Sequence, residues 1–286
     1  MAEIIRIKKG LDIPLSGNPS SEVTADKKTT TFAVCPDDFP GHVWKAVVKP
    51  GDFVYAGDPL LKDKATQRIV IASPVSGLVD EVRRGERRHI EFVSINRDPE
   101  KSVTKKAVPS NQEEIKNLIL ESGLWAMMRQ RPYDIVPDAG TTPRDIFVTA
   151  FDSAPLAGEL LTDSLTKWLE KGLESLTALT SGKVYLGVRA GSGIKSHAAE
   201  VYEFEGPHPS GNVGTQIAAI NPVNKGETVW TLDAVTVAKI GKLCGEGEID
   251  YSTTVALTGP EIKNPRMIST VIGASISTCL LYTSPS

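Results

Sequence analysis

Short stretches in which apolar and polar residues alternate, separated by glycine and proline, characterise the first third of the chain. Two of them, residues 47–61 and 69–82, combine apolar positions with turn-forming residues, a pattern typical of β-hairpins. Their glycines supply the positive φ angles that tight turns require. This part of the chain is therefore predicted to form an all-β domain over residues 1–100.

The two hairpin segments together resemble the barrel-sandwich fold of biotinyl- and lipoyl-type domains. Carrier domains of this type bear a modified lysine at an exposed hairpin tip. The corresponding tip, residues 62–68, is shorter and has no Met-Lys pair. We therefore interpret Lys64 as part of a solvated turn on a structural barrel.

A different periodicity begins after the polar stretch 97–110, which contains two prolines and indicates a linker. Ser110 as the N-cap and Glu113 three positions later form a capping-box pattern, which predicts the start of a helix. Apolar residues continue at helical spacing, so the helix is expected to run to residue 131 and to end at Pro132.

Apolar segments then alternate between strand and helix character. Residues 146–150 and 183–188 are typical of buried strands, and residues 160–179 are typical of a long amphipathic helix. This alternation predicts a Rossmann-like α/β domain with a parallel sheet over residues 108–256. The Gly-rich segment 189–196 has neither the Walker A spacing nor the G-x-G-x-x-G spacing, so we expect a strand-to-helix loop there.

Composition narrows the class of protein. The 286 residues are 40% apolar and 23% charged with a net charge of −3, as in a globular chain of about two domains rather than a general nucleic-acid binder. Cys35, Cys244 and Cys279 form no C-x-x-C pair, and the histidines do not lie at metal-ligand spacing. No secretory signal is recognisable at the N-terminus, which predicts a cytoplasmic chain. No catalytic triad or nucleophile elbow can be assigned, which predicts a chain that is not catalytic by itself.

Two segments lie outside this pattern. Residues 279–286 resemble a translated adapter of sequencing libraries, so we expect a non-native tail that interrupts the natural sequence after residue 278. The turn at residues 83–89 carries Arg84, Arg87 and Arg88, which are candidates for docking to an acidic partner, to lipid headgroups or to phosphates. Alternatively, these arginines form a solvated turn whose charge is partly cancelled by neighbouring glutamates.

Several blocks occur in the order found in one known family: 7–14, 48–61, 72–77, 84–88, 121–125, 131–133, 146–152, 206–215, 228–230 and 240–243. Together they resemble NqrA, a component of the sodium-translocating NADH:quinone reductase, and the Gly-Pro-His-Pro sequence in 206–215 is the most specific of them. The resemblance implies a barrel-sandwich domain, a Rossmann-like domain and, over residues 257–278, the start of a β-grasp (SLBB) domain.

The resemblance also implies a function. The family's chain is peripheral and lies on the cytoplasmic face of a membrane complex that passes electrons from NADH to quinone and exports Na⁺. It implies docking chiefly to NqrB, the flavin-bearing membrane component. FMN, FAD and the iron–sulfur centre are then held by partner subunits, whereas this chain holds no cofactor firmly and can contact quinone. The alternative is a component of an Rnf-type electron-transfer complex, which would need flavin-loop glycines and further iron–sulfur cysteines.

Candidate contacts to quinone or to a partner are Trp125, Arg129, Arg131, Tyr133 and His208. Arginines and aromatic rings at the end of a helix can stack on a quinone ring and donate a hydrogen bond to its carbonyl. The alternative is that Trp125 belongs to the core and that the arginines cover its rim.

Overall fold

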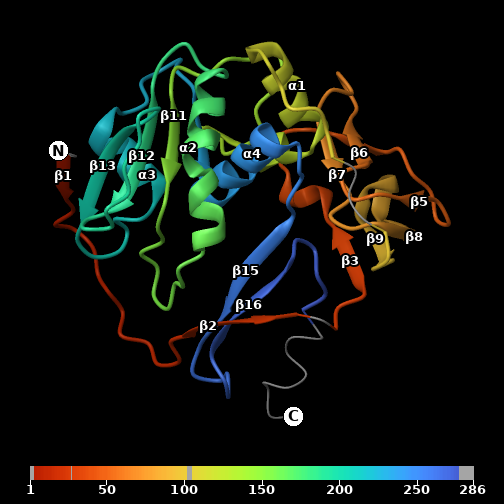
Figure 1. Ribbon diagram of the computed structural model, residues 1–286, viewed down its shortest axis with the longest axis horizontal. Coiled ribbons are helices and arrows are strands. Elements are labelled where there is room, and N and C mark those ends of the chain that lie inside the picture. Colours follow the sequence, from red (N-terminus) through yellow and green to blue (C-terminus); the bar gives the residue numbers. More distant parts are fainter. Residues whose placement is uncertain (1–2, 27, 102–104, 277–286) are drawn as a thin grey trace.

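The computed structural model describes residues 3–26, 28–101 and 105–276 (Figure 1). The expected non-native tail at residues 279–286 lies outside these residues. A six-stranded sheet with its helices occupies one side of the molecule, a β-barrel the other, and a small three-stranded sheet the space below them.

The six-stranded sheet confirms the predicted α/β architecture. Its strands, in spatial order, are β1 (Glu3–Arg6), β13 (Glu200–Glu205), β12 (Val184–Arg189), β11 (Ile146–Thr149), β14 (Val229–Asp233) and β10 (Arg129–Arg131). All neighbouring pairs are parallel except β10 and β14, which are antiparallel.

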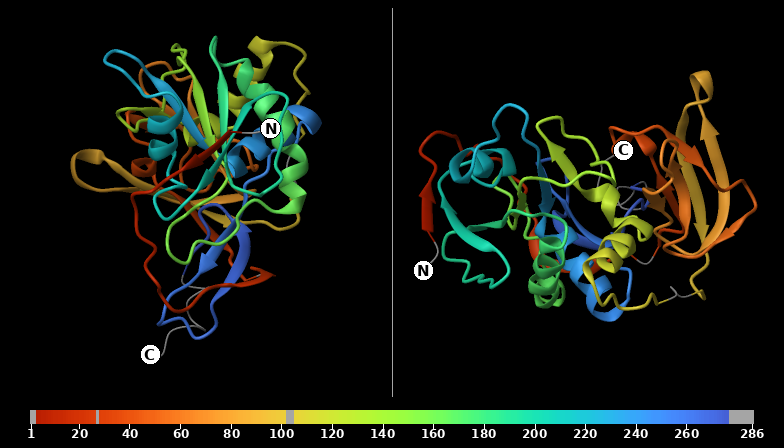
Figure 2. Two further views of the ribbon diagram at one scale, coloured as in Figure 1. Left: turned by 90° about the vertical axis from the view of Figure 1, so that its left-hand side faces the viewer. Right: turned by 90° about the horizontal axis from the view of Figure 1, so that it is seen from above.

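Helices cover both faces of this sheet, as Figure 2 shows. The four α-helices of the described residues are α1 (Gln112–Glu121), α2 (Asp163–Thr177), α3 (Val213–Ile220) and α4 (Ala234–Glu246). Successive residues of a strand point to opposite faces: Phe147 packs with Ile217 of α3, whereas its neighbours join the large core that includes α2 and α4. The backbones of α2 and α4 approach closely, because a Cβ atom at Gly172 would lie 2.0 Å from the carbonyl oxygen of Val237.

Two antiparallel sheets form the barrel. One contains β3 (Thr31–Val34), β9 (Ile90–Arg97), β8 (Gly77–Arg84) and β5 (Phe53–Val54), and the other contains β4 (Trp44–Ala46), β6 (Pro59–Asp63) and β7 (Val70–Ala72). Two short 3₁₀ helices, η1 (Pro36–Asp38) and η2 (Glu86–Arg88), complete this part. The predicted hairpins are present, and their inward-facing aliphatic side chains are fully buried.

The hairpin tip around Lys64 is organised by a buried carboxylate. Asp63, with 1% of its surface exposed, accepts hydrogen bonds from the backbone N–H groups of Thr66 at 2.7 Å and Ile69 at 2.9 Å. The Thr66 hydroxyl donates a further bond at 2.8 Å. These bonds hold the turn in place and explain why an aspartate and a threonine occupy positions 63 and 66.

A third sheet joins distant parts of the chain. It contains β15 (Ser252–Leu257), β16 (Arg266–Val271) and β2 (Ser20–Ala25), with β2 parallel to β16. The segment expected to belong to the barrel, residues 1–100, therefore contributes its first strand to the α/β sheet and its second strand to this one. Barrel pairing begins at β3.

The helix predicted from Ser110 to residue 131 is wrong at both ends. Its N-cap is Asn111, whose side chain accepts the Glu114 N–H at 2.9 Å, so the cap is shifted by one residue. The helix ends at Glu121, because Gly123 adopts a left-handed φ of 77°. A 3₁₀ turn, η3 (Leu124–Met127), and then β10 follow.

The glycine-rich segment also differs from expectation. After β12 it leads into β13, a further parallel strand, rather than into a helix. The turn residues were recognisable from the sequence. The segment after them becomes strand β13 because it pairs with β12 on one side and β1 on the other.

Candidate functional site

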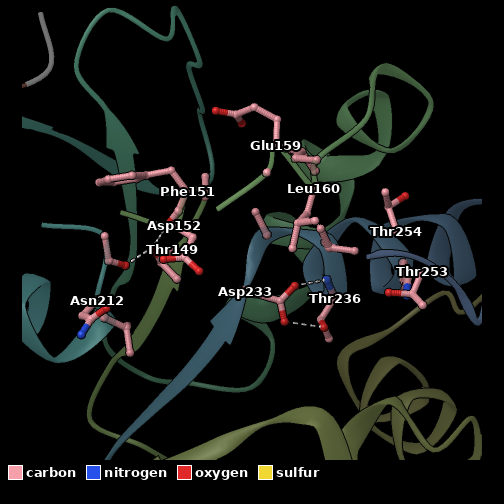
Figure 3. A pocket seen from close by; sticks show the side chains of 18 of the residues that line it. Thr149, Phe151, Asp152, Glu159, Leu160, Asn212, Asp233, Thr236, Thr253 and Thr254 are labelled. Carbon is pink, nitrogen blue, oxygen red and sulfur yellow. Dashed lines mark hydrogen bonds between the residues drawn. The ribbon is translucent and has the colours of Figure 1, made fainter. Parts of the chain in front are cut away.

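A cavity of about 870 Å³ opens at the carboxyl ends of β11 and β14 (Figure 3). The chain leaves β11 to form β12 on one side and later returns to form β14 on the other side, so the strand order reverses at this point. Crossovers that leave in opposite directions open a crevice, which is where open α/β sheets bind ligands. The volume lies within the range of small-molecule sites.

Several separate segments line this cavity. They are residues 149–152 at the end of β11, 158–161 before α2, 211–215 at the start of α3, 233–236 and Lys239 at the start of α4, Thr253 and Thr254 of β15, Ile272, and Arg131 of β10. The site thus combines segments of the large sheet, its helices and the small third sheet around the end of the parallel strands.

Two helices begin at the cavity, and they are capped differently. Asp233 caps α4: its carboxylate accepts the Thr236 N–H at 2.8 Å and the Thr236 hydroxyl at 2.7 Å, as Figure 3 shows. The N-cap residue of α3, Asn212, makes no side-chain capping bond. Within the described residues, the N–H groups of Val213 and Gly214 have no hydrogen-bond acceptor. This end of α3 therefore presents free donors and the positive end of its dipole.

Lys239 is the most unusual side chain of the lining. Only 4% of its surface is exposed, and within the described ranges its ammonium has no hydrogen bond and no carboxylate within 4.0 Å. Burial lowers the pKa of Lys239, and the charges of Asp250 and Asp233 only partly oppose this shift. Both carboxylates already accept bonds from other donors, Asp250 from Lys242 and Asp233 from Thr236.

The second cation of the lining is Arg131. One of its terminal nitrogens lies 3.4 Å from Asp134, while its buried Nε has no hydrogen-bond partner in the described part of the chain. Acidic residues are also present, namely Asp152, Glu159 and Asp233. The lining therefore offers hydroxyls, backbone amides and two incompletely paired cations, a donor-rich set suited to binding an oxygen-rich ligand.

The predicted contact residues do not converge on one surface. Trp125 is fully buried, and its indole N–H donates to the Pro137 carbonyl at 2.8 Å. Arg129 donates to the carbonyl oxygens of Ala126 at 2.8 Å and Asp38 at 2.7 Å. Trp125 thus connects η3 to the segment at Pro137, and Arg129 connects β10 to η3 and η1.

The remaining three candidates are dispersed. Arg131 lines the cavity, whereas Tyr133 is 73% exposed outside it. His208 contacts the Ser153 hydroxyl through Nδ1 at 3.1 Å, and its backbone N–H donates to the Asp12 carboxylate at 2.9 Å. His208 therefore joins the N-terminal segment to the loop after β11.

The three docking candidates lie at the tip of the β8–β9 hairpin, which projects from the barrel (Figure 2). Arg87 and Arg88 both have positive φ angles, and Arg84 donates to the Arg88 carbonyl at 3.3 Å. Neighbouring Arg83 pairs with two glutamates. Among the described residues, Arg84, Arg87 and Arg88 have no carboxylate within 4.0 Å.

Sequence reasoning missed the cavity and Lys239. A signal was available, because the predicted strand 146–150 is followed by an aspartate, and Asp233 lies directly before an apolar helix as an N-cap. Polar residues that follow parallel strands mark the binding edge of such a sheet. The burial of Lys239 has no comparable local signal.

Neither a metal centre nor a membrane span is found in the described residues. No group of three or more His, Cys, Asp or Glu residues is placed to hold a metal ion there. The same residues include no helix that is both long and apolar enough to cross a bilayer.

The fold and the cavity define a multidomain protein in which a barrel-sandwich domain precedes a Rossmann-like domain with a ligand-sized site at its strand switch. Three family models match the chain in succession: the NqrA N-terminal barrel-sandwich hybrid domain at 5–98, the NqrA second alpha/beta domain at 110–249 and the NqrA C-terminal (SLBB) domain at 254–281. The chain belongs to the NqrA family, and the expected fold class is confirmed.

Curated relatives agree with this assignment. The chain is 36% identical over 285 residues to the NqrA subunit of the Na(+)-translocating NADH-quinone reductase of Pasteurella multocida (strain Pm70). It is 37% identical over 283 residues to the NqrA of Vibrio vulnificus (strain YJ016), and 33% identical over 285 residues to that of Neisseria meningitidis (strain MC58). Each alignment covers 96% of this chain and 64% of the relative, so the chain spans just under two thirds of their length.

Proposed function

We propose that the chain acts as the peripheral NqrA component of a sodium-translocating NADH:quinone reductase, on the cytoplasmic face of the membrane. The observation that carries this proposal is the match of three successive NqrA domain models in family order. In this role the chain docks to the membrane-embedded components, chiefly NqrB. NADH oxidation, the flavins FMN and FAD, and the iron–sulfur centre belong to partner subunits.

The docking surface in this proposal is the arginine turn, defined as Arg84, Arg87 and Arg88. Its support is geometric: the three side chains lie on a projecting hairpin and are unpaired with carboxylates among the described residues. Exposed unpaired charges steer association with a surface of opposite sign. An acidic face of a membrane component fits these properties.

The quinone contact in this proposal is Arg131. Its guanidinium lies on the cavity wall and its side chain is about one third exposed, so its terminal nitrogens can donate to a quinone carbonyl. Trp125 and Arg129 support the segment through their own hydrogen bonds rather than by touching quinone. Tyr133 and His208 would contact the partner or the ring only from outside the cavity.

A pull-down tests the assignment to this complex. Tagged chain is incubated with detergent-solubilised membranes of the organism that encodes it, and the retained proteins are identified by mass spectrometry. Retention of the sodium pump's flavin-bearing membrane components supports the proposal. Retention of Rnf-type components favours the alternative complex, and retention of neither by a chain with a folded circular-dichroism spectrum refutes both.

The same assay tests the arginine turn. We expect the triple substitution Arg84→Glu, Arg87→Glu and Arg88→Glu to abolish retention, because each reversal turns an attraction into a repulsion. Arg68→Glu, at a different exposed turn of the barrel, is the matched control and should leave retention unchanged. Equal loss in both variants would show a general charge effect and would remove the turn from the proposal.

The quinone contact is tested in the assembled complex. Arg131→Ala should raise the KM for quinone, because the carbonyl loses its donor, whereas Arg266→Ala, a change in β16 away from the cavity, should not. Unchanged kinetics in an Arg131→Ala complex of normal subunit content would refute the assignment.

A further inference from the structure

We infer that the cavity at the β11–β14 switch binds a phosphorylated small molecule of nucleotide size, with Lys239 as the counter-ion of its phosphate. This site does not depend on which complex the chain joins. It shares the cavity with the quinone contact proposed above, because Arg131 lines the same cavity, so the phosphorylated ligand and quinone would exclude each other.

The ammonium of Lys239 carries the inference. Only 4% of the residue's surface is exposed, yet the Nζ atom is open to the cavity rather than sealed in the core, and no described residue pairs with it. A charge in so enclosed a place is costly without a counter-ion, so proteins rarely retain one there unless something else pairs with it. Lys239 follows Thr236 by three residues on α4 and thus lies on the same face of that helix, toward the cavity that both residues line. A phosphate in the cavity would supply the partner that the described residues do not.

Hydroxyl groups surround this end of the cavity. Thr253 and Thr254 of β15 lie beside Thr236 in Figure 3, at the end away from Asn212. No hydrogen bond to the hydroxyl of Thr253 or Thr254 is present among the described residues. An ammonium and a threonine hydroxyl are donors that suit a phosphate's terminal oxygens.

The opposite end offers an independent set of donors. The N-terminus of α3 lacks a side-chain cap, and the N–H groups of Val213 and Gly214 have no acceptor in the described residues. A Cβ atom built on Gly214 would meet nothing within 4 Å, so the space in front of these amides is open. A helix N-terminus of this kind attracts anionic oxygens.

The acidic residues of the lining are compatible with this ligand. Asp233 is occupied as the cap of α4, and one Asp152 oxygen accepts the Ala154 N–H at 2.7 Å. Glu159 points away from the Thr236 end in Figure 3. Carboxylates at the rim can accept hydrogen bonds from ligand hydroxyls, as a sugar would provide. The cavity volume of about 870 Å³ far exceeds a phosphate ion and suits a nucleotide.

Isothermal titration calorimetry with the purified chain tests this inference. ADP and inorganic phosphate are the probes, at constant ionic strength set with sodium chloride, because non-specific attraction falls with added salt. The inference is supported if ADP binds and inorganic phosphate competes weakly with it for the site. Binding of phosphate without ADP, or no heat from either probe up to about 10 mM, overturns the nucleotide-sized ligand.

Two substitutions connect the binding to the named groups. Lys239→Met keeps the side-chain length and removes the charge, and it should weaken binding at least tenfold. Asn212→Asp adds a negative charge at the α3 N-terminus while keeping a good helix cap, so the fold is retained and binding should weaken. Lys225→Met is the matched control, since Lys225 is exposed in the loop before β14, away from the carboxyl end of that strand.

The outcomes are separable from those of the proposed function. Equal affinities in wild type, Lys239→Met and Asn212→Asp overturn the site, whatever the pull-down retains. A loss of affinity in both variants but not in Lys225→Met supports it even if the chain joins no sodium pump.

Discussion

Removal of the charge at Lys239 is expected to stabilise the unliganded chain. The side chain is almost fully enclosed, and its ammonium has no partner in the described residues, whereas Asp233 and Asp250, whose charges act on it, keep other donors when it is lost. Lys239→Met retains most of the volume of the aliphatic stem, so packing changes little. The substitution therefore removes an unfavourable burial without creating a cavity.

The cost of an unsatisfied buried polar group, about 1–3 kcal/mol in the free energy of unfolding, is the upper limit of the gain, because Nζ remains open to the cavity. For a chain of this size, each kcal/mol corresponds to a rise in Tm of about 2–4 °C. The effect depends on pH in a definite direction. Because the folded-state pKa of Lys239 lies below its ordinary value of 10.5, the unfolded chain binds more protons between these two values. Wild-type stability thus rises with pH in that window, and the advantage of Lys239→Met shrinks there.

Urea unfolding followed by circular dichroism at several pH values measures this difference. The matched control is Lys242→Met, nearly one turn further along α4, where the ammonium lies 2.6 Å from Glu248 and 3.1 Å from Asp250. Loss of that pair should destabilise the chain, since Asp250 then keeps a partly buried charge with fewer donors. The reasoning is refuted if both lysine variants lose stability, or if the gain for Lys239→Met grows as the pH rises.

The close contact of α2 and α4 makes Gly172→Ala destabilising by about 1–3 kcal/mol in urea unfolding, because overpacking against the Val237 carbonyl outweighs the better helix propensity of alanine. Gly214→Ala, where no atom lies within 4 Å, should leave Tm unchanged or raise it. At the barrel turn, burial alone would raise the pKa of Asp63, but hydrogen bonds from Thr66 and Ile69 outweigh burial and lower it. The ionised carboxylate of Asp63 therefore stabilises the fold fully above the ordinary aspartate pKa, and this stabilisation is lost as the pH falls through the lowered pKa of Asp63. In Asp63→Asn, the free energy of unfolding should therefore decrease less steeply than in wild type as the pH is lowered from 7. An equally steep decrease in both proteins would contradict the argument.

Purely local signals were sufficient for much of the fold. The barrel hairpins follow from turn glycines between alternating residues, and the parallel sheet follows from strands that alternate with an amphipathic helix. Where the helical pattern predicted too long a helix, a contact with a distant segment set its actual end. The first helix of the α/β domain ends at Glu121 because Gly123 turns left-handed beside Ala72, where a Cβ atom would lie 2.9 Å from that side chain.

The candidate site shows the limit of sequence reasoning most clearly. Trp125 and Arg129 are polar-tipped side chains that suggest a contact surface, but in the folded chain they donate to backbone carbonyls of neighbouring segments. The open α3 terminus, and a Lys239 ammonium that no described residue pairs, become visible only when the segments around residues 150, 212, 236 and 253 meet at one edge of the sheet.

The amino-acid sequence by itself determined most of the element types, the two main folding units and the family, because each rests on residues near one another in the chain. Only the tertiary structure decided that β1 and β2 leave the barrel for other sheets, and that a lysine of ordinary appearance is buried beside a cavity. Strand pairing and desolvation depend on atoms supplied by distant segments, and no local pattern of apolar and polar residues encodes which segments those are.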